Sequence, residues 1–182
     1  MKKAIEFIIF PFLLSAFSFA IYEQLQPMID YELCKLCDAI KYKKIYENFI
    51  NGTFKPVDYP FYTRLLTPFI ASIFSKSNAI SGFHYTNALF LILTNTTLYY
   101  TWKNYLKLGF VTCLIGLVWL NFHWTGIPRY YNLHVVNVDT GAFFFQALTI
   151  LLLIKNKFKW FLLVVPLAVF QKESYMPIFL II

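Results

Sequence analysis

The residues of this chain that are best suited to chemistry are charged side chains beside long apolar runs. They are Asp38 with the nearby Tyr42, then Arg64, Arg129 and Asp139, and finally the adjacent pair Lys172 and Glu173. Charges at membrane depth are costly, so they usually face a cavity or a partner and mark candidate functional sites. An aspartate in such a place suits a general base or a metal ligand, and the cations suit a phosphate.

Asp38 begins a stretch with the pattern of a short amphipathic helix. Asp38 and Tyr42 are four residues apart, and Ile45 and Tyr46 continue the same face. An acid at the head of such a helix, close to the outer membrane surface, is a candidate general base or metal ligand. Capping the helix is the alternative, and it is the more common role of an isolated aspartate.

The role of Asp139 depends on where the apolar helix around it begins. A helix from Gly141 to position 154 has 14 residues, too few to cross a bilayer, so we expect it to begin at Val135. That start puts Asp139 about 6 Å inside the helix. Alternatively, Asp139 and Thr140 cap the helix. Arg129 precedes this helix start, where it suits a phosphate, a sugar or the lipid head groups.

Lys172 and Glu173 interrupt the last apolar stretch, residues 160–182. If that stretch is one helix, the pair lies roughly 18–20 Å along it, near the middle of the membrane. If a short helix over residues 161–170 ends before the pair, the two charges lie at the outer mouth of a cavity. A loop at the membrane surface between two short helices is the third possibility.

Two of the three cysteines, Cys34 and Cys37, form a CxxC motif in the loop before Asp38. On the oxidising side of a membrane this pair is a disulfide candidate. The same spacing occurs in redox motifs and in half of a zinc site, but zinc needs two more ligands and the sequence has no second CxxC. Cys113, inside an apolar run, is expected to be a packing residue.

Composition places the chain in a membrane. It has 182 residues, of which 59% are hydrophobic, 21% aromatic and 14% charged, whereas a soluble domain has about 25% charged residues. So much apolar surface cannot be buried inside a domain of this length. We therefore predict an all-α fold: a polytopic transmembrane bundle of about 4–6 spans, with an outer loop that carries a short amphipathic helix.

The distribution of lysines predicts the orientation. The expected spans are residues 4–22, 85–102, 108–124 and 135–154, followed by the stretch from residue 160, and an additional helix over 61–75 is expected at the outer surface. Lysine clusters flank them at Lys2 and Lys3, at Lys103 and Lys107, and at Lys155, Lys157 and Lys159. An N-terminus in the cytoplasm puts every cluster inside, as the positive-inside rule requires. The net charge of +7 thus reflects topology, and nucleic-acid binding is not expected.

The organisation follows from these spans. Residues 1–182 are expected to form a single transmembrane domain, with residues 23–60 as its outer loop. Ser18-Phe19-Ala20 has the form of a signal-peptide cleavage site, but the apolar run is unbroken, so we expect the first span to be retained as an anchor. Because the sequence stops within an apolar stretch, we expect it to be the N-terminal portion of a longer protein.

The strings Asp38-Ala-x-x-Tyr42 and Pro60-Phe61-x-x-Arg64-Leu65-Leu66-Thr67-Pro68 support a family resemblance. They resemble the start of bacterial polytopic membrane proteins of the GT-C glycosyltransferase type, whose first outer loop carries an essential aspartate. The resemblance implies sugar transfer from a polyprenyl-phosphate donor on the outer face of the inner membrane. Asp38 would then be the base or the ligand of a divalent metal ion, and Arg64, Arg129 and Lys172 would neutralise the departing phosphate.

Two other classes stay open from the residues alone. A small non-enzymatic membrane subunit or transporter fragment would use the same charges for structure or binding. A quinone-linked thiol-disulfide oxidoreductase would use Cys34 and Cys37, although such enzymes need a second cysteine pair and only Cys113 is left. In every case membrane lipids are the expected surroundings.

Overall fold

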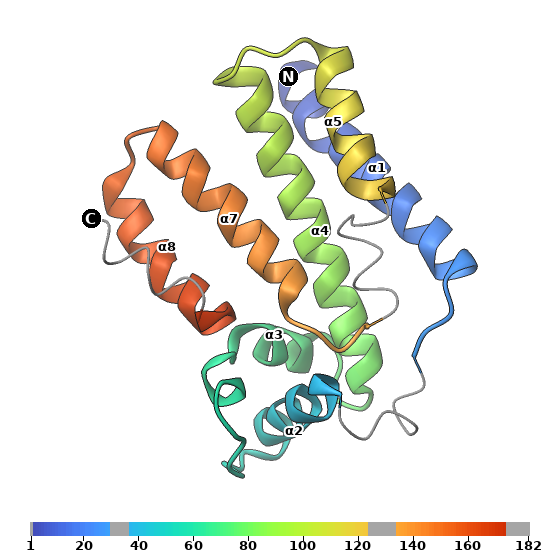
Figure 1. Ribbon diagram of the computed structural model, residues 1–182, viewed down its shortest axis with the longest axis vertical. Helices are drawn as coiled ribbons and strands as arrows, with labels where there is room; N and C mark the ends of the chain where they lie inside the picture. Colours follow the sequence, from blue (N-terminus) through green and yellow to red (C-terminus); the bar gives the residue numbers. More distant parts are fainter. Residues whose placement is uncertain (1, 30–36, 124–133, 174–182) are drawn as a thin grey trace.

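The structure is a computed structural model that describes residues 2–29, 37–123 and 134–173. In these residues it contains seven α-helices, one 3₁₀ turn and no strand, so the predicted all-α class is confirmed (Figure 1). The helices are α1 (Lys2–Leu25), α2 (Asp38–Asn51), α3 (Leu66–Phe74), α4 (Ala79–Asn104), α5 (Phe110–Phe122), α7 (Asp139–Ile154) and α8 (Phe158–Gln171), and the turn is η1 (Phe61–Thr63).

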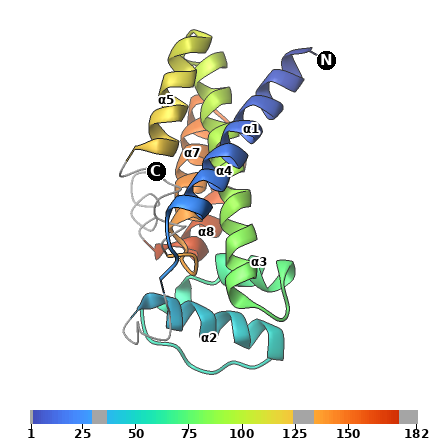
Figure 2. The ribbon, with the colours of Figure 1, turned by 90° about the vertical axis from the view of Figure 1, so that its right-hand side faces the viewer.

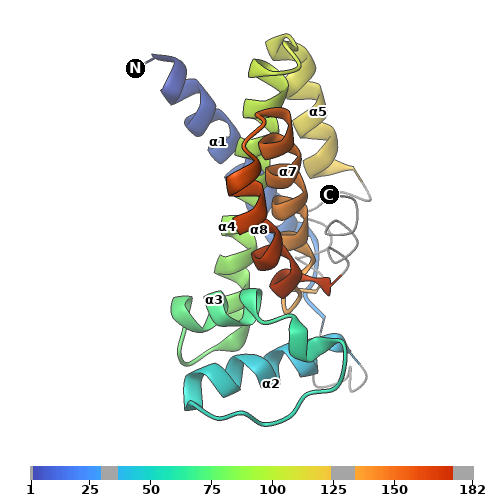
Figure 3. The same cartoon turned by 90° about the vertical axis from the view of Figure 1, so that its left-hand side faces the viewer.

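The helices form a long bundle with a cap at one end. α4 is the central helix: α1 and α5 pack on one side of it and α7 on the other, with α8 against α7 (Figure 1). α2 lies across one end of the bundle, and α3 lies between α2 and the start of α4 (Figures 2 and 3). We call residues 37–78, which contain α2, η1 and α3, the outer layer, after the side of the membrane that the sequence predicts for them.

By length and composition, one helix of the described part is able to cross a membrane, namely α1 over Phe7–Leu25. α5, α7 and α8 are apolar but have 13, 16 and 14 residues, fewer than the about 20 that a span requires. The predicted number of spans therefore stays a prediction.

α2 has the amphipathic character expected of it. Its buried face consists of Ala39, Tyr42, Ile45 and Tyr46, which pack against α3, the start of α4 and the segment before α7. The Tyr46 hydroxyl donates to the Ser75 carbonyl at 2.7 Å. The helix predicted over residues 61–75 is divided into η1 and α3, and Arg64 lies between them.

The predicted helix start at Val135 is wrong, because α7 begins at Asp139. Asn87 of α4 donates from Nδ2 to the Val135 carbonyl at 2.7 Å, so that carbonyl is satisfied outside a helix. Val135, Val136 and Val138 are buried under α2 in an irregular segment. Asp139 is consequently in the first turn of α7, not about 6 Å inside a helix as the earlier start implies.

α8 ends at Gln171, and Lys172 has extended backbone angles of φ −160° and ψ 127°. A single helix over residues 160–182, with the charged pair near its middle, is therefore wrong. The other two placements open from the sequence both end a helix before Lys172 and Glu173, as observed, and they differ in residues that lie outside the described part. The end of α8 lies at the end of the bundle that carries the outer layer (Figure 3), and Glu173 bonds there to Arg64.

A neutral polar cluster lies inside the bundle where α1, α4 and α5 meet. We call it the asparagine cluster; it consists of Asn95, Asn121, Ser15 and Ser18, all at most 1% exposed. Asn95 Nδ2 donates to Asn121 Oδ1 at 3.0 Å, and Asn121 Nδ2 donates to Asn95 Oδ1 at 3.1 Å. Asn95 also donates to Ser15 Oγ at 2.8 Å, and Ser18 Oγ donates to Asn121 at 3.1 Å.

The two ends of the bundle differ in charge. α1 begins, α4 ends, α7 ends and α8 begins at the end opposite the outer layer (Figure 1). Lys103 lies in the last turn of α4, and Lys155 and Lys157 lie between α7 and α8. The lysine clusters that the sequence assigns to the cytoplasmic side are thus brought to one end of the fold.

Candidate functional site

A cavity of about 350 Å³ lies between the start of α2, the segment that leads into α7, and the end of α8. We call it the charged cavity. Its lining includes five of the residues predicted from the sequence as site residues: Asp38, Tyr42, Arg64, Asp139 and Lys172. These residues come from places up to 134 positions apart in the sequence, and the fold brings them together. Arg129, also predicted, lies outside the described residues.

Arg64 is the most fully bonded of these groups. Its Nε donates to Glu173 Oε2 at 2.7 Å, a second guanidinium nitrogen pairs with Glu173 Oε1, and a third donates to the Tyr42 hydroxyl oxygen at 2.6 Å. The guanidinium carbon also lies 5.4 Å from the centre of the Phe61 ring. The Glu173 hydrogen bonds raise the pKa of Arg64, and the Arg64 hydrogen bonds lower the pKa of Glu173. Both groups are charged at neutral pH.

Tyr42 is held in its protonated form. Its pKa is raised to about 12, mainly by burial and to a smaller extent by the charges of Asp139 and Asp38, while the hydrogen bond and the charge of Arg64 oppose this rise. Because Arg64 donates to the phenolic oxygen, the phenolic hydrogen is left to donate elsewhere. Tyr42 is thus a donor on the wall of a cavity that Asp38 and Asp139 also line.

Lys172 pairs with Asp139 rather than with Glu173. Its Nζ lies 2.6 Å from Asp139 Oδ1, and the two side chains are 31% and 48% exposed. The Arg64 and Glu173 side chains are only 12% and 20% exposed. The Lys172–Asp139 pair is therefore the more accessible of the two ion pairs. Because it is partly in water, it contributes little to stability.

Asp38 is the first residue of α2, with Cys37 in the N-cap position and no side-chain cap hydrogen bond. Among the residues that the structure describes, none forms a hydrogen bond or an ion pair with the Asp38 carboxylate. Capping α2, the alternative role for this residue, is therefore not what the side chain does here. Its charge is still favoured by the amino end of the helix.

A buried hydrogen-bond network fixes the end of α8. Gln171, which is fully buried, donates to Thr67 Oγ1 at 2.7 Å and to the Val138 carbonyl, and it accepts from the Thr67 hydroxyl at 2.8 Å. The network joins α3, α7 and α8 immediately before Lys172. A Cβ at Gly141 would lie 2.4 Å from Gln171 Nε2, so only glycine leaves room for this amide.

The cysteines lie in different surroundings. Cys37 is disulfide-bonded and lines the charged cavity. Its predicted partner, Cys34, lies outside the described residues, so the pairing itself stays a prediction. Cys113 is a free thiol, fully buried with Tyr99 and Leu117 as a packing residue between α4 and α5.

The predicted divalent metal ion also stays a prediction. Within the described ranges, no group of three or more His, Cys, Asp or Glu residues has a metal-binding arrangement. His134 and Asn137 line the cavity beside Asp139 and add a nitrogen and an amide oxygen to the potential ligands. The Asn137 amide oxygen, however, already accepts from the Asp139 backbone N–H at 3.1 Å.

Sequence reasoning missed Asn137, Gln171 and Thr67 as residues that position the site. Asn137 and Gln171 are adjacent or nearly adjacent to Asp139 and Lys172, and a polar residue next to a charge in an apolar run is a usable signal. Thr67 gave no comparable signal, because it belongs to a motif in which Arg64 is the more conspicuous residue.

Comparison with known proteins gave no relative. No family model matches the chain, and neither a curated protein nor a solved structure matches it.

Proposed function

We propose that this chain is a membrane glycosyltransferase-like protein that transfers a sugar from a lipid-phosphate donor on the outer face of the membrane. The observation that carries the proposal is the charged cavity, where the unpaired Asp38 carboxylate lies with Lys172 and the Tyr42 hydroxyl. A base, a cation and a neutral donor in one cavity are what this reaction needs.

The proposal includes a membrane position with the N-terminus in the cytoplasm. It is supported by the lysines at one end of the bundle and by the large apolar side chains on the outside of its helices. On α1, Ile8, Phe12, Leu13 and Phe17 are exposed; on α5, Val111, Ile115 and Trp119; on α8, Trp160, Leu163, Leu167 and Phe170. α5, α7 and α8 would be about 20–24 Å long, so they would cross only if the bilayer thins around them.

In the proposed reaction, the acceptor hydroxyl oxygen attacks the anomeric carbon of the donor sugar. Its bond to that carbon forms, the bond from carbon to the phosphate oxygen breaks, and Asp38 takes the hydroxyl proton. The negative charge that develops on the lipid phosphate is stabilised by Lys172 and by the hydrogen of the Tyr42 hydroxyl. Arg64 positions Tyr42, because each of its three guanidinium nitrogens already donates to Glu173 or to Tyr42.

The test is sugar transfer by the full-length protein in membrane vesicles that contain a polyprenyl-phosphate sugar. Asp38→Asn should lower the rate by about 10²–10⁴-fold, the usual contribution of a general base. Asp58→Asn is the matched control, because Asp58 is an aspartate of the same layer that is 75% exposed and pairs with Lys41 outside the cavity. Transfer that survives Asp38→Asn would remove the role assigned to this residue.

A second candidate is a non-enzymatic binding subunit, and one observation favours it. Each cation of the cavity already has a carboxylate partner, Arg64 with Glu173 and Lys172 with Asp139. Such a set of paired charges is stable without a substrate. Binding of the polyprenyl-phosphate sugar with no turnover, unchanged by Asp38→Asn, would support this candidate.

The thiol-disulfide oxidoreductase is the minor alternative. A relay of electrons from Cys37 needs a second cysteine pair, and Cys113 is buried among apolar and aromatic side chains that include Tyr99 and Leu117. Trapping of free thiols during incubation with quinone distinguishes this alternative, because a structural disulfide stays oxidised throughout.

A further inference from the structure

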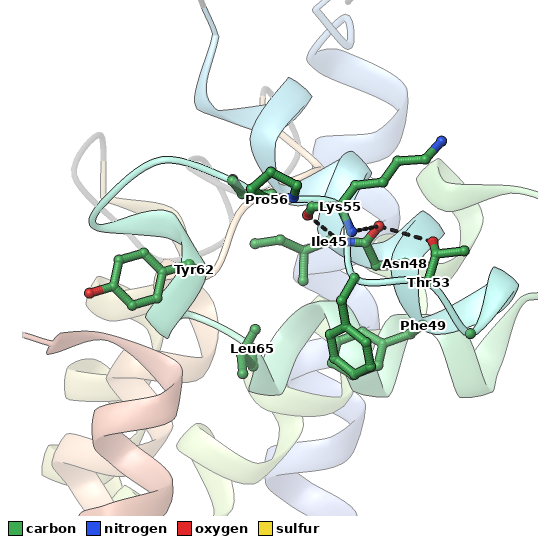
Figure 4. Close-up of a pocket in the computed structure, with 11 residues that line it drawn as sticks. Ile45, Asn48, Phe49, Thr53, Lys55, Pro56, Tyr62 and Leu65 are labelled. Atoms are coloured by element: carbon green, nitrogen blue, oxygen red, sulfur yellow. Dashed lines mark hydrogen bonds between the residues drawn. The ribbon is translucent and has the colours of Figure 1, made fainter.

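A second hollow lies on the same face of α2 as the charged cavity, nearer the carboxyl end of the helix. Asp38 and Tyr42 face the cavity, while Ile45, Phe49 and Gly52 line the second hollow. These five positions follow one another at spacings of three or four residues, so they form one stripe along the helix. The second hollow has a volume of about 470 Å³, and we call it the apolar pocket (Figure 4).

The polar groups in the wall of the apolar pocket are bonded to one another. Asn48 Nδ2 donates to the Lys55 carbonyl at 2.9 Å. Asn48 Oδ1 accepts from the Lys55 backbone N–H at 3.2 Å and from the Thr53 hydroxyl at 3.3 Å (Figure 4). These bonds close the turn after α2 and leave the side-chain amide with little capacity for a ligand. The rest of the lining is mainly apolar: Ile45, Phe49, Phe54, Pro56, Val57, Tyr62 and Leu65.

The apolar pocket is continuous with an apolar surface on α3. The rings of Phe49, in the pocket wall, and Phe69, on α3, are 5.3 Å apart. Phe69 is 45% exposed, and Ile73 one turn further along is 64% exposed. At the outer surface of a bilayer this face would lie against lipid chains, so a chain could pass from the membrane into the pocket.

The charge of the surroundings favours an anionic ligand. The outer layer, residues 37–78, carries six basic and three acidic residues. Lys55 lines the pocket, and its ammonium group extends away from the pocket interior (Figure 4). An apolar interior with a cation at the rim suits an amphiphile with a negative head group and a hydrocarbon tail.

We propose that the apolar pocket binds a hydrocarbon chain of an anionic membrane phospholipid, with Lys55 near its phosphate. The proposal rests on the membrane position proposed above but not on sugar transfer. A bound lipid chain would hold α2, the helix that carries Asp38 and Tyr42, against α3.

The test uses the full chain in vesicles with phosphatidylglycerol that carries a photoactivatable diazirine in its acyl chain. After irradiation, mass spectrometry should find labelled peptides from residues 45–65 as well as from the exposed face of α1. Label on α1 without label on residues 45–65 would overturn the pocket proposal and leave the membrane position intact. Absence of label from both would overturn the two together.

Two pairs of variants sharpen the result. Val57→Trp fills the pocket and should reduce labelling of residues 45–65 severalfold with α1 labelling unchanged, whereas Ile150→Trp, on the exposed face of α7 and outside the pocket, should not. Lys55→Gln should weaken labelling by phosphatidylglycerol about fivefold relative to Lys76→Gln, an exposed lysine outside the pocket. Equal labelling of the pocket by phosphatidylcholine and phosphatidylglycerol probes in the unmodified chain would contradict the anionic ligand.

Discussion

The asparagine cluster and the charged cavity are two polar regions of one helical bundle, and they differ in how completely their groups are bonded. The amides of Asn95 and Asn121 bond reciprocally, and the whole cluster is at most 1% exposed. In the charged cavity the ion pairs are partly exposed, and no described residue bonds the Asp38 carboxylate. Neutral, closed networks stabilise helix packing, whereas an open carboxylate beside cations is a group available to a ligand.

The largest expected loss of folding stability from a single substitution is at Arg64, in the charged cavity. Arg64→Met leaves Glu173 as a largely buried carboxylate without its partner, so the free energy of unfolding should fall by about 3 kcal/mol. Denaturant unfolding of the full chain in detergent measures it. The double variant Arg64→Met/Glu173→Leu should recover part of the loss, and a double variant no more stable than the single one would contradict the pairing.

At Lys172 we expect the reverse of Arg64, namely a large loss of sugar transfer and a small loss of folding stability. Lys172→Met removes the more exposed cation, so sugar transfer should fall by about 10²–10³-fold, while the free energy of unfolding changes by less than about 1 kcal/mol. Transfer rates and denaturant unfolding are measured on the same preparation. Lys76→Met, an exposed lysine of the outer layer, is the control. A stability loss as large as that of Arg64→Met would make Lys172 structural.

A substitution in the asparagine cluster should affect only stability. Asn95→Leu removes the reciprocal bonds to the Asn121 amide and the bond to Ser15 Oγ, at a cost of about 1–3 kcal/mol. Asn121 keeps its bonds to the Leu117 carbonyl and to Ser18, and Ser15 keeps its bond to the Pro11 carbonyl. Transfer per folded molecule should be unchanged. Asn104→Leu, near the end of the same helix and bonded only to the Tyr100 carbonyl, is the matched control. A loss of activity at full folding would make the cluster part of the site.

The smallest expected effect is on how the free energy of unfolding changes at acid pH. The charged cavity should contribute to this change, and the asparagine cluster should not. The Arg64 hydrogen bonds hold the pKa of Glu173 below its ordinary value of 4.5, so the folded state takes up this proton less readily than the unfolded state. The stability from this pair is complete above about pH 4.5 and is lost as the pH falls below that value through the folded-state pKa. Glu173→Gln should flatten this part of the profile; Asn95→Leu should not, because the asparagine cluster does not titrate.

The sequence predicted the charged cavity better than it predicted the helices around it. Spacing alone gave the amphipathic face of α2, and the cost of charges in apolar runs pointed to Arg64, Asp139 and Lys172, which the fold brings together. The wrong start of α7 has a different cause. Val135 stays outside the helix because Asn87, 48 residues earlier, bonds its carbonyl, and hydropathy carries no information about such a contact.

The asparagine cluster was missed for a related reason. Asn95 has the sequence context of a glycosylation site, and Ser15 that of an ordinary residue in an apolar helix. Their partnership depends on how α1, α4 and α5 rotate against one another, which no single helix reveals. The end of α8 was left open because Gln171 finds its partners, Thr67 and Val138, on two other elements.

The close contact between Gly141 and Gln171 has an evolutionary consequence. Because a Cβ at position 141 would lie 2.4 Å from the Gln171 amide nitrogen and 2.9 Å from the Phe90 ring, a larger residue at 141 needs a change at 171 and a shift of Phe90. In related sequences, a larger residue at 141 should be accompanied by a smaller one at 171. Covariation between these two positions would indicate that related proteins keep the α7–α8 contact, on which the placement of Lys172 depends.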